Sequence, residues 1–163
     1  MTEIRPAVDA DLDDLKAIYD LECLHGHATF HTEPMPRSLW EDRLGSPHPS
    51  DLMFVAVEGG QLLGGAWSTA YRDRAAYDAT RETSVYLAAA AQGRGLGRQL
   101  YDVLLPRLRD TGTHTALAAI ALPNPASRRL HRAVGFEPVG TLREVGRKLG
   151  RWVDVELWQL VFG

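Results

Sequence analysis

The sequence predicts a mixed α/β fold in a single domain that spans residues 1–163, with a twisted sheet of about seven strands and helices on both of its faces. A chain of 163 residues suits one domain with a sizeable core. Hydrophobic residues make up 45% and charged residues 24% of the chain, as in ordinary globular proteins. Segments of helical periodicity also alternate along the chain with short apolar segments, and we find no repeat, linker or low-complexity tail.

The first half of the chain is expected to form a strand, two helices and a hairpin. Asp9 can cap a helix that follows the strand at residues 4–7, and this helix breaks near Gly26. A short helix is expected from Pro36 to Leu44. Strands at residues 52–57 and 62–69 are then joined by Glu58-Gly59-Gly60-Gln61 as a hairpin.

The second half is expected to contain the central strand, at residues 83–87, and a helix from Gly95 to about Thr111 whose last turns Pro106 should disturb. The apolar strand at residues 114–121 shows little alternation, which indicates burial on both faces. Asn124 and Pro125 suit the cap and first position of another helix. Two closing strands follow at residues 136–145 and 152–162.

A glycine-rich turn joins the central strand to the helix after it. Its sequence is Gln92-Gly93-Arg94-Gly95-Leu96-Gly97-Arg98. Glycines leave backbone N–H groups free beside the positive end of the helix dipole, an arrangement that suits a phosphate or pyrophosphate. The same pattern also fits a tight strand-to-helix turn that binds nothing.

Two common phosphate loops fit this turn badly. A Walker loop needs Gly-Lys-Ser/Thr, whereas Gly97 is followed by Arg98. A dinucleotide fingerprint needs Gly-x-Gly-x-x-Gly near the start of a βαβ unit, and the spacing here is Gly-x-Gly-x-Gly, halfway along the chain. The pattern Gln92-x-x-Gly95-x-Gly97 instead resembles the acyl-coenzyme A (CoA) pyrophosphate loop of the GNAT superfamily of N-acetyltransferases.

Composition argues against several other classes of function. The net charge is −3 and no basic run is interleaved with aromatic residues, which argues against a nucleic-acid partner. Cys23 is the single cysteine, and no apolar run approaches the length of a membrane span or a signal peptide, so we expect an intracellular, cytoplasmic protein without a membrane partner. His25, His27 and His31 lack a closing set of ligands, so no metal is expected.

Motifs spread along the chain extend the resemblance from the superfamily to one family. They resemble the phosphinothricin N-acetyltransferase family, whose near relatives prefer methionine sulfone or sulfoximine. The motifs are Thr29-Phe30-His31-Thr32-Glu33-Pro34, Arg74-Ala-Ala-Tyr77-Asp78, Glu82-Thr-Ser-Val-Tyr86, Leu122-Pro123-Asn124, Leu130-His131-x-x-x-Gly135-Phe136 and Gly150-Arg-Trp152-x-Asp154-x-x-x-Trp158-Gln159-Leu160.

The resemblance implies direct transfer of an acetyl group from acetyl-CoA to the α-amine of a small amino acid analogue. Glu82 would be the base that removes a proton from the amine, directly or through a water molecule. Tyr101 would protonate the departing thiolate, and His131 would orient the substrate or relay a proton. Each of the three also has a plain structural reading, as a strand, helix-packing or core residue.

The resemblance also implies the residues that bind acetyl-CoA. The strand would pair with the pantetheine arm, where it splays from the next strand, and the glycine loop would hold the pyrophosphate. Asn124 and Ser127 would reach the far arm of the cofactor. The strand residues are Val85, Tyr86 and Leu87, and the loop residues are Gln92, Gly93, Arg94, Gly95, Leu96, Gly97 and Arg98.

For the substrate, the resemblance implies an apolar wall of Phe30 and Tyr77, with Arg74 and Arg72 binding an anionic group. The chain departs from the family at His31, where phosphinothricin enzymes usually carry arginine. A neutral sulfone would tolerate the loss of this cation better than a phosphinate would.

Two other readings stay open. One is that the protein acetylates a protein or peptide amine. The other is that it is a non-catalytic module that binds acetyl-CoA. A closed substrate site argues against the first reading, and the presence of Glu82 and Tyr101 argues against the second. The family commonly forms dimers, so a homodimer is expected.

Overall fold

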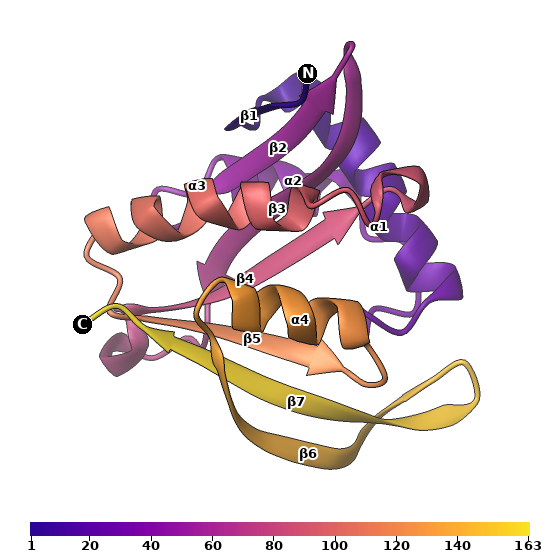
Figure 1. Cartoon of the computed structure of the whole chain (residues 1–163), viewed down its shortest axis with the longest axis vertical. Helices are drawn as coiled ribbons and strands as arrows, with labels where there is room; N and C mark the ends of the chain where they lie inside the picture. Colours follow the sequence, from indigo (N-terminus) through magenta and orange to yellow (C-terminus); the bar gives the residue numbers. More distant parts are fainter.

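The computed structural model describes residues 1–163 and contains one seven-stranded sheet in the order β1-β2-β3-β4-β5-β7-β6 (Figure 1). This confirms the predicted mixed sheet with helices. The strands are β1 (Glu3–Pro6), β2 (Met53–Glu58), β3 (Gln61–Ala70), β4 (Thr80–Leu87), β5 (Thr115–Ala121), β6 (Glu137–Lys148) and β7 (Arg151–Val161). The helices are α1 (Leu12–His25), α2 (Arg37–Leu44), α3 (Leu96–Asp110) and α4 (Pro125–Ala133).

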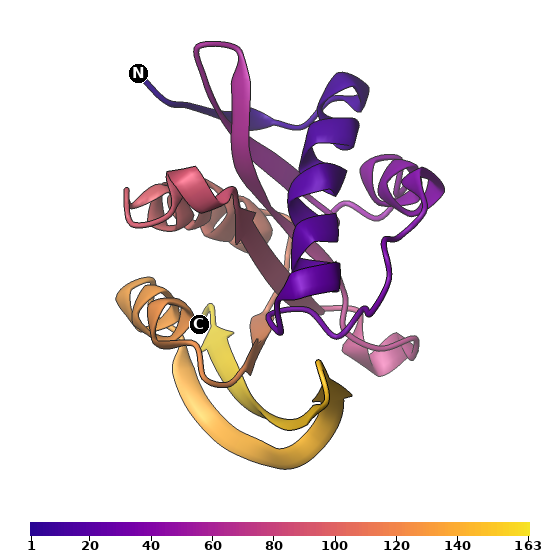
Figure 2. The same cartoon turned by 90° about the vertical axis from the view of Figure 1, so that its right-hand side faces the viewer.

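The helices cover the two faces of the sheet in pairs. Figure 2 shows α1 and α2 on one face and α3 and α4 on the other. Two separate apolar clusters match this division. One gathers Tyr19 of α1 and Trp40 of α2 over Trp67 of β3, and the other gathers Leu100 and Leu104 of α3 against β5 and β7. The amphipathic faces read from the sequence therefore bury against opposite sides of one sheet.

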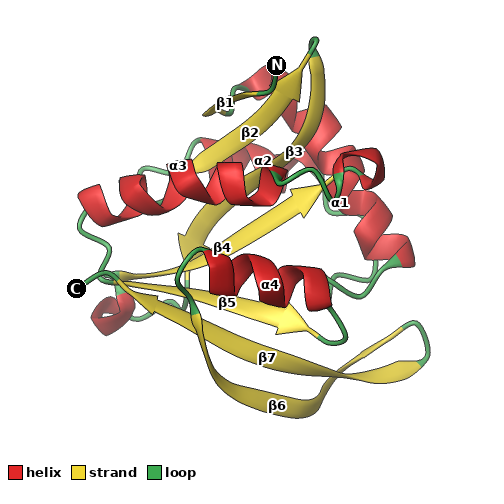
Figure 3. Cartoon of the chain, viewed as in Figure 1, coloured by secondary structure: helices red, strands yellow, loops and turns green.

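The sheet opens between β4 and β5, its only parallel pair. These strands pair from Thr80 with Thr115 to Glu82 with Leu117, and no further. Figure 3 shows them diverging beyond this point. Because the ladder ends at Glu82, the backbone of residues 83–87 has one edge without a neighbouring strand. The splay that the resemblance implied is confirmed.

The opening corrects the prediction for β5. Ala116, Ala118, Ile120 and Ala121 are buried, but Ala119 is exposed and Thr115 and Leu117 are only half-buried. One face of β5 packs on the core, whereas the other borders the gap left by β4. A nearly uniform apolar strand therefore lines a cavity instead of being buried on both faces.

Two local predictions are also wrong. Residues Asp9–Asp11 form a 3-10 turn, α1 begins at Leu12, and the Asp11 carboxylate accepts the N–H of Val8 at 2.8 Å. Asp9 therefore does not cap the helix. Helix α3 runs without a break to Asp110 despite Pro106. Pro106 has no N–H to donate to the carbonyl oxygen of Asp102, but both residues lie on the exposed side of the helix.

The closing hairpin of β6 and β7 projects from the body of the protein (Figure 1). Its turn is tighter than predicted, because Leu149 and Gly150 both adopt positive φ angles and the strands extend up to them. Strand β6 lies at the edge of the sheet, and nearly all of its residues are exposed. No helix of the chain is both long and apolar enough to cross a bilayer.

Candidate active site

Two neighbouring cavities, each of about 580 Å³, lie at the gap between β4 and β5. The first extends from Tyr19 and Trp67 on one side of the sheet to Tyr101 and His131 on the other. The second lies against the glycine loop and the start of α4. The two cavities share five lining residues: Ala28, Val85, Tyr86, Asn124 and Ser127. They therefore form one continuous site with two compartments.

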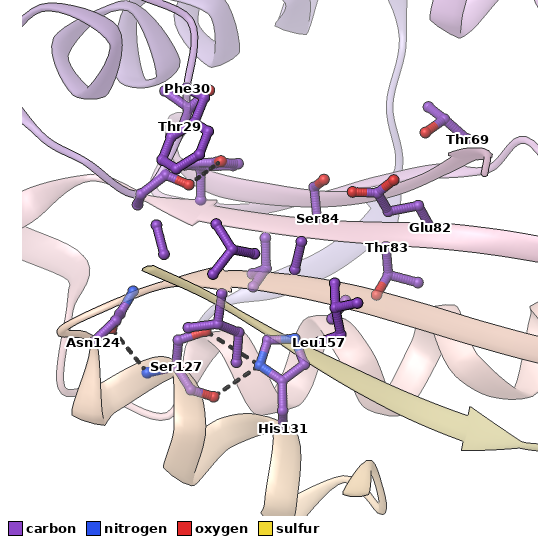
Figure 4. A pocket seen from close by; sticks show the side chains of 18 of the residues that line it. Thr29, Phe30, Thr69, Glu82, Thr83, Ser84, Asn124, Ser127, His131 and Leu157 are labelled. Atoms are coloured by element: carbon purple, nitrogen blue, oxygen red, sulfur yellow. Dashed lines mark hydrogen bonds between the residues drawn. The ribbon is translucent and has the colours of Figure 1, made fainter. Parts of the chain in front are cut away.

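Glu82 lies at the point where the sheet opens. It pairs with Thr69 of β3 and Leu117 of β5, and its side chain lines the first cavity beside Ser84 (Figure 4). Burial raises the pKa of the Glu82 carboxyl, and no charged group opposes this effect. A half-buried carboxyl without an ionic partner, facing a cavity, is suited to accept a proton.

Tyr101 and His131 approach the same cavity from α3 and α4. The fully buried Tyr101 hydroxyl lies 3.0 Å from His131 Nε2 and 3.1 Å from Thr83 Oγ1. On the other side of the imidazole ring, Nδ1 lies 2.7 Å from the Ser127 carbonyl oxygen and 3.2 Å from Ser127 Oγ. Figure 4 shows His131 and Ser127 below β4, opposite Glu82.

These contacts fix the proton positions in the network. A carbonyl oxygen only accepts, so His131 Nδ1 donates to Ser127. Burial lowers the pKa of His131, so the ring is neutral and its Nε2 accepts the Tyr101 proton. Burial also raises the pKa of Tyr101. Tyr101 therefore keeps its proton and can act as a donor.

The glycine loop and the start of α3 form the second cavity. Gly93 and Gly95 adopt φ angles of 76° and 77°, which other residues reach only with strain. Gly95 is the N-cap of α3, and no side chain caps the N–H groups of the first turn. A Cβ at Gly97 would lie 2.9 Å from Leu130, so this glycine lets α3 and α4 approach closely.

Nearly all of the predicted cofactor residues line this second cavity. Asn124 caps α4 by accepting the Ser127 N–H at 3.1 Å, as predicted, and both residues also face the cavity. Arg98 lines the cavity, whereas Arg94 turns away to form an ion pair with Glu58 at 2.9 Å. The others that line it are Val85, Tyr86, Leu87, Gln92, Gly93, Gly95, Leu96 and Gly97.

The four predicted substrate residues separate into two groups. Phe30 and Arg72 line the first cavity. Arg74 and Tyr77 do not: Arg74 is exposed before the 3-10 turn Ala75–Tyr77, and the Tyr77 ring packs edge-on against the pocket residue Tyr71, with centroids 5.3 Å apart. The structure thus brings only half of this predicted set to the cavity.

The segment after α1 closes over the cavity against the β6–β7 hairpin. A Cβ at Gly146 of β6 would lie 2.2 Å from the Phe30 ring, so only glycine leaves room for this contact. Lys148 donates from Nζ to the carbonyl oxygens of Thr29 at 2.6 Å and Glu22 at 3.0 Å. These contacts tie the loop to the hairpin and narrow the cavity.

Two of the three neighbouring histidines have protein partners. His31 Nδ1 lies 2.6 Å from the Tyr19 hydroxyl, and His27 Nε2 lies 2.8 Å from the carbonyl oxygen of Pro123. No group of three or more histidine, cysteine or acidic side chains is placed to hold a metal ion.

Sequence reasoning missed several residues that line the first cavity. Arg43 of α2 and Trp67 of β3 both lie there. Arg43 follows the fully buried Trp40 by three residues, so it shares the inward face of its helix. That spacing was the available signal, but an arginine on a short polar helix is more often exposed.

Comparison with known proteins points to one family. The model of the "Acetyltransferase (GNAT) family" matches residues 15–136. The chain is 41% identical over 162 residues to a phosphinothricin N-acetyltransferase of Streptomyces coelicolor, covering 96% of this chain and 94% of the relative. It is 37% identical over 163 residues to an L-methionine sulfoximine/L-methionine sulfone acetyltransferase of Pseudomonas aeruginosa, covering 96% and 92%.

Solved structures agree with this assignment. A phosphinothricin acetyltransferase from Sinorhizobium meliloti in complex with acetyl-CoA superposes with a TM-score of 0.93 and 34% identity, covering 99% of this chain and 89% of that one. A ribosomal-protein-alanine N-acetyltransferase from Brucella melitensis gives a TM-score of 0.93 and 34% identity, covering 98% and 99%.

Proposed function

Because this chain belongs to the GNAT acetyltransferase family, as its motifs predicted, we propose that it transfers the acetyl group of acetyl-CoA to the α-amine of a small amino acid analogue. The analogue is of the phosphinothricin, methionine sulfone or methionine sulfoximine type, as the names of the relatives suggest. The observation that carries this proposal is the position of Glu82, which faces a cavity continuous with the one beside the glycine loop.

The proposed cofactor site uses the second compartment. The N–H groups around Gly93, Gly95 and Gly97 would bind the pyrophosphate, since no side chain caps the start of α3. The free edge of β4 at residues 85–87 would bind the pantetheine arm, and Asn124 and Ser127 the opposite side. When bound, acetyl-CoA supplies the thioester that the amine attacks, with an N–C bond forming as the C–S bond breaks.

Glu82 would take the proton that the substrate ammonium loses, directly or through a water molecule. Its raised pKa supports this role, because a base works best when its pKa approaches the working pH. The Tyr101 hydroxyl would turn from His131 Nε2 toward the leaving sulfur and give the thiolate its proton, and the phenolate would regain a proton from water after CoA leaves. His131 would act by holding that hydroxyl at the edge of the cavity.

The remaining assignments concern the substrate side and the assembly. Phe30 and Arg72 would contact the substrate, whereas Arg74 and Tyr77 could act only at the rim, beside Tyr71. We propose one domain over residues 1–163, a cytoplasmic location, where acetyl-CoA is made and used, and a homodimer. The dimer is supported by the edge strand β6, whose Val139, Leu142 and Val145 are exposed.

A second candidate is acetylation of a peptide amine, favoured by the likeness to a ribosomal-protein-alanine N-acetyltransferase. The contacts of Phe30 with Gly146 and of Lys148 with Thr29 argue against it, because they close the cavity where a peptide would have to pass.

A thiol-release assay with acetyl-CoA tests the proposal. The amines would be phosphinothricin, methionine sulfone, methionine sulfoximine and a peptide with a free N-terminus. We expect release with at least one of the amino acid analogues and none with the peptide. Thiol release with the peptide alone would overturn the proposed substrate class. If none of the four amines causes thiol release, a non-catalytic module that binds acetyl-CoA would be favoured.

A further inference from the structure

The wall of the first cavity contains a guanidinium group without a counter-ion. Arg43 of α2 lines this cavity, and its guanidinium carbon lies 5.1 Å from the ring centre of Trp40 and 5.6 Å from that of Trp67. Its Nη1 atom is buried and has no hydrogen-bond partner. A buried donor on a charged group is costly to leave unpaired, so such groups normally have an anionic or carbonyl partner.

Arg81 is more deeply buried than the half-buried Arg43, and its Nε also has no partner, yet its charge is paired. Arg81 donates to the Asp51 carboxylate at 2.9 Å and to the Asp78 carbonyl oxygen at 3.0 Å. The groups whose charge acts on Arg43 are the phenols of Tyr19 and Tyr86, with no carboxylate among them. Burial lowers the pKa of Arg43, yet a guanidinium remains protonated in proteins. The cavity therefore contains a positive charge that nothing in the chain neutralises.

Arg43 lies on the same side of the sheet as Glu82. It stacks over Trp67, which pairs directly with Ser84 in the antiparallel β3–β4 ladder. Ser84 is two residues from Glu82, so Trp67, Ser84 and Glu82 project from one face. Arg43 and Glu82 both line the cavity but make no ion pair with each other, and burial is the only cause of the raised pKa of Glu82. A ligand in this cavity therefore meets two separate groups of opposite charge, the Glu82 carboxylate and the Arg43 guanidinium.

His31 does not supply the cation that the family usually places after its phenylalanine. The Nδ1 atom of His31 lies 2.6 Å from the Tyr19 hydroxyl. Burial lowers the pKa of His31, and the charges of Arg43 and Lys148 lower it further. His31 is therefore neutral at neutral pH, and the positive charge on this side of the cavity comes instead from Arg43 of α2.

We propose that Arg43 binds an anionic side-chain group of the substrate, so that the protein prefers amino acid analogues with an anionic side chain, such as a phosphinate, over the neutral sulfone. This inference rests on the proposed function and refines its substrate class. Glu82 would face the α-amine, Arg72 at the exposed side of the cavity the α-carboxylate, and Arg43 the side-chain anion. Three charged residues would then match the three charged groups of phosphinothricin. The departure at His31, which alone favours a neutral sulfone, is offset by Arg43.

The test compares kcat/KM for phosphinothricin and methionine sulfone in the wild type, R43M and R43K. We expect the wild type to prefer phosphinothricin, and R43M to lose about 10- to 100-fold on phosphinothricin, the usual effect of removing a hydrogen bond to a charged group, with a much smaller loss on the sulfone. R43K keeps the charge without the planar fork and should give an intermediate preference. The ratio of the two kcat/KM values does not depend on the fraction of enzyme that is folded.

Arg37→Met is the matched control, because Arg37 lies on the same helix but pairs on the surface with Asp13 at 2.8 Å. Its substrate ratio should stay within about twofold of the wild type. A wild type that prefers the sulfone, or an R43M ratio equal to that of the wild type, would overturn the inference while leaving the acetyltransferase proposal intact. Should R43M not fold, R43K and the wild-type ratio decide the question. Failure of the wild type on every amino acid analogue would instead overturn the proposed function.

Discussion

Glu82→Gln removes one proton acceptor from the active site and changes little else. The Glu82 side chain is half-buried and faces the cavity, and no charged group acts on its pKa. Glutamine has nearly the same shape as glutamate, so packing is preserved, and the substitution breaks no ion pair because Glu82 makes none. General-base catalysis contributes roughly 10²- to 10⁴-fold, and kcat with the amino acid analogue should fall by that factor. The dissociation constant for acetyl-CoA should not change, because the glycine loop lies in the other compartment.

The pH dependence gives this prediction its sign. Burial raises the pKa of Glu82 above the ordinary glutamate value, so wild-type kcat/KM should decline on the acid side at a higher pH than an exposed glutamate would give. In Glu82→Gln, kcat/KM should not show this decline at acid pH (the acid limb of the profile). A carboxyl with a raised folded-state pKa favours the protonated native state, so wild-type stability falls as pH rises through that pKa. Glu82→Gln should therefore unfold at the same or a higher temperature at neutral pH, and this difference should vanish in acid.

The assays are steady-state thiol release against pH and thermal unfolding, with Glu137→Gln as the control because Glu137 is an exposed carboxylate on β6. Two results would refute the reasoning. One is a variant that keeps its turnover and its acid limb. The other is a variant whose lost turnover is matched by weaker acetyl-CoA binding and a lower unfolding temperature, which would indicate a structural role.

Two further substitutions test the cofactor loop and the acid. Gly95→Ala forces a side chain onto a φ of 77° without a steric clash, at a cost of about 1–2 kcal/mol, and should weaken acetyl-CoA binding about 5- to 30-fold by calorimetry. Gly112→Ala, at a φ of 91° and also without a clash, should lower stability similarly but leave that affinity unchanged; equal affinities in the two variants would count against the loop assignment. Tyr101→Phe leaves Thr83 Oγ1 and His131 Nε2 without this partner and should lower kcat and reduce the free energy of unfolding by about 1–3 kcal/mol in urea titrations. Unchanged kcat would remove Tyr101 from the mechanism.

Local signals in the sequence were sufficient for most of the fold. The glycine turn, the cap at Asn124 and the end of α1 near Gly26 are each encoded within a few neighbouring residues, and the structure has them where expected. The strand β5 was misjudged because its environment depends on where β4 diverges, which is set by distant packing. Asp9 was misjudged because Asp11 offers a competing hydrogen-bond acceptor at the same turn.

Site residues that belong to local sequence motifs were predictable, whereas contacts between distant parts of the chain were not. The Tyr101–His131 contact joins two helices, and 30 residues separate its partners. Arg43 had no motif, and its meaning comes from the two tryptophan rings around it and from the missing counter-ion. Arg74 belongs to a motif, yet it lies outside the cavity, because the segment before β4 turns its side chain toward solvent.

A crystal structure with CoA and N-acetylmethionine sulfone tests the central claim most directly, namely that the gap between β4 and β5 is where the thioester meets the amine. We predict that the pyrophosphate binds the N–H groups around Gly95, that the sulfur lies beside the Tyr101 hydroxyl, and that the amide nitrogen faces Glu82. A cofactor bound outside the two cavities, or an amide nitrogen that faces a residue other than Glu82, would contradict the account.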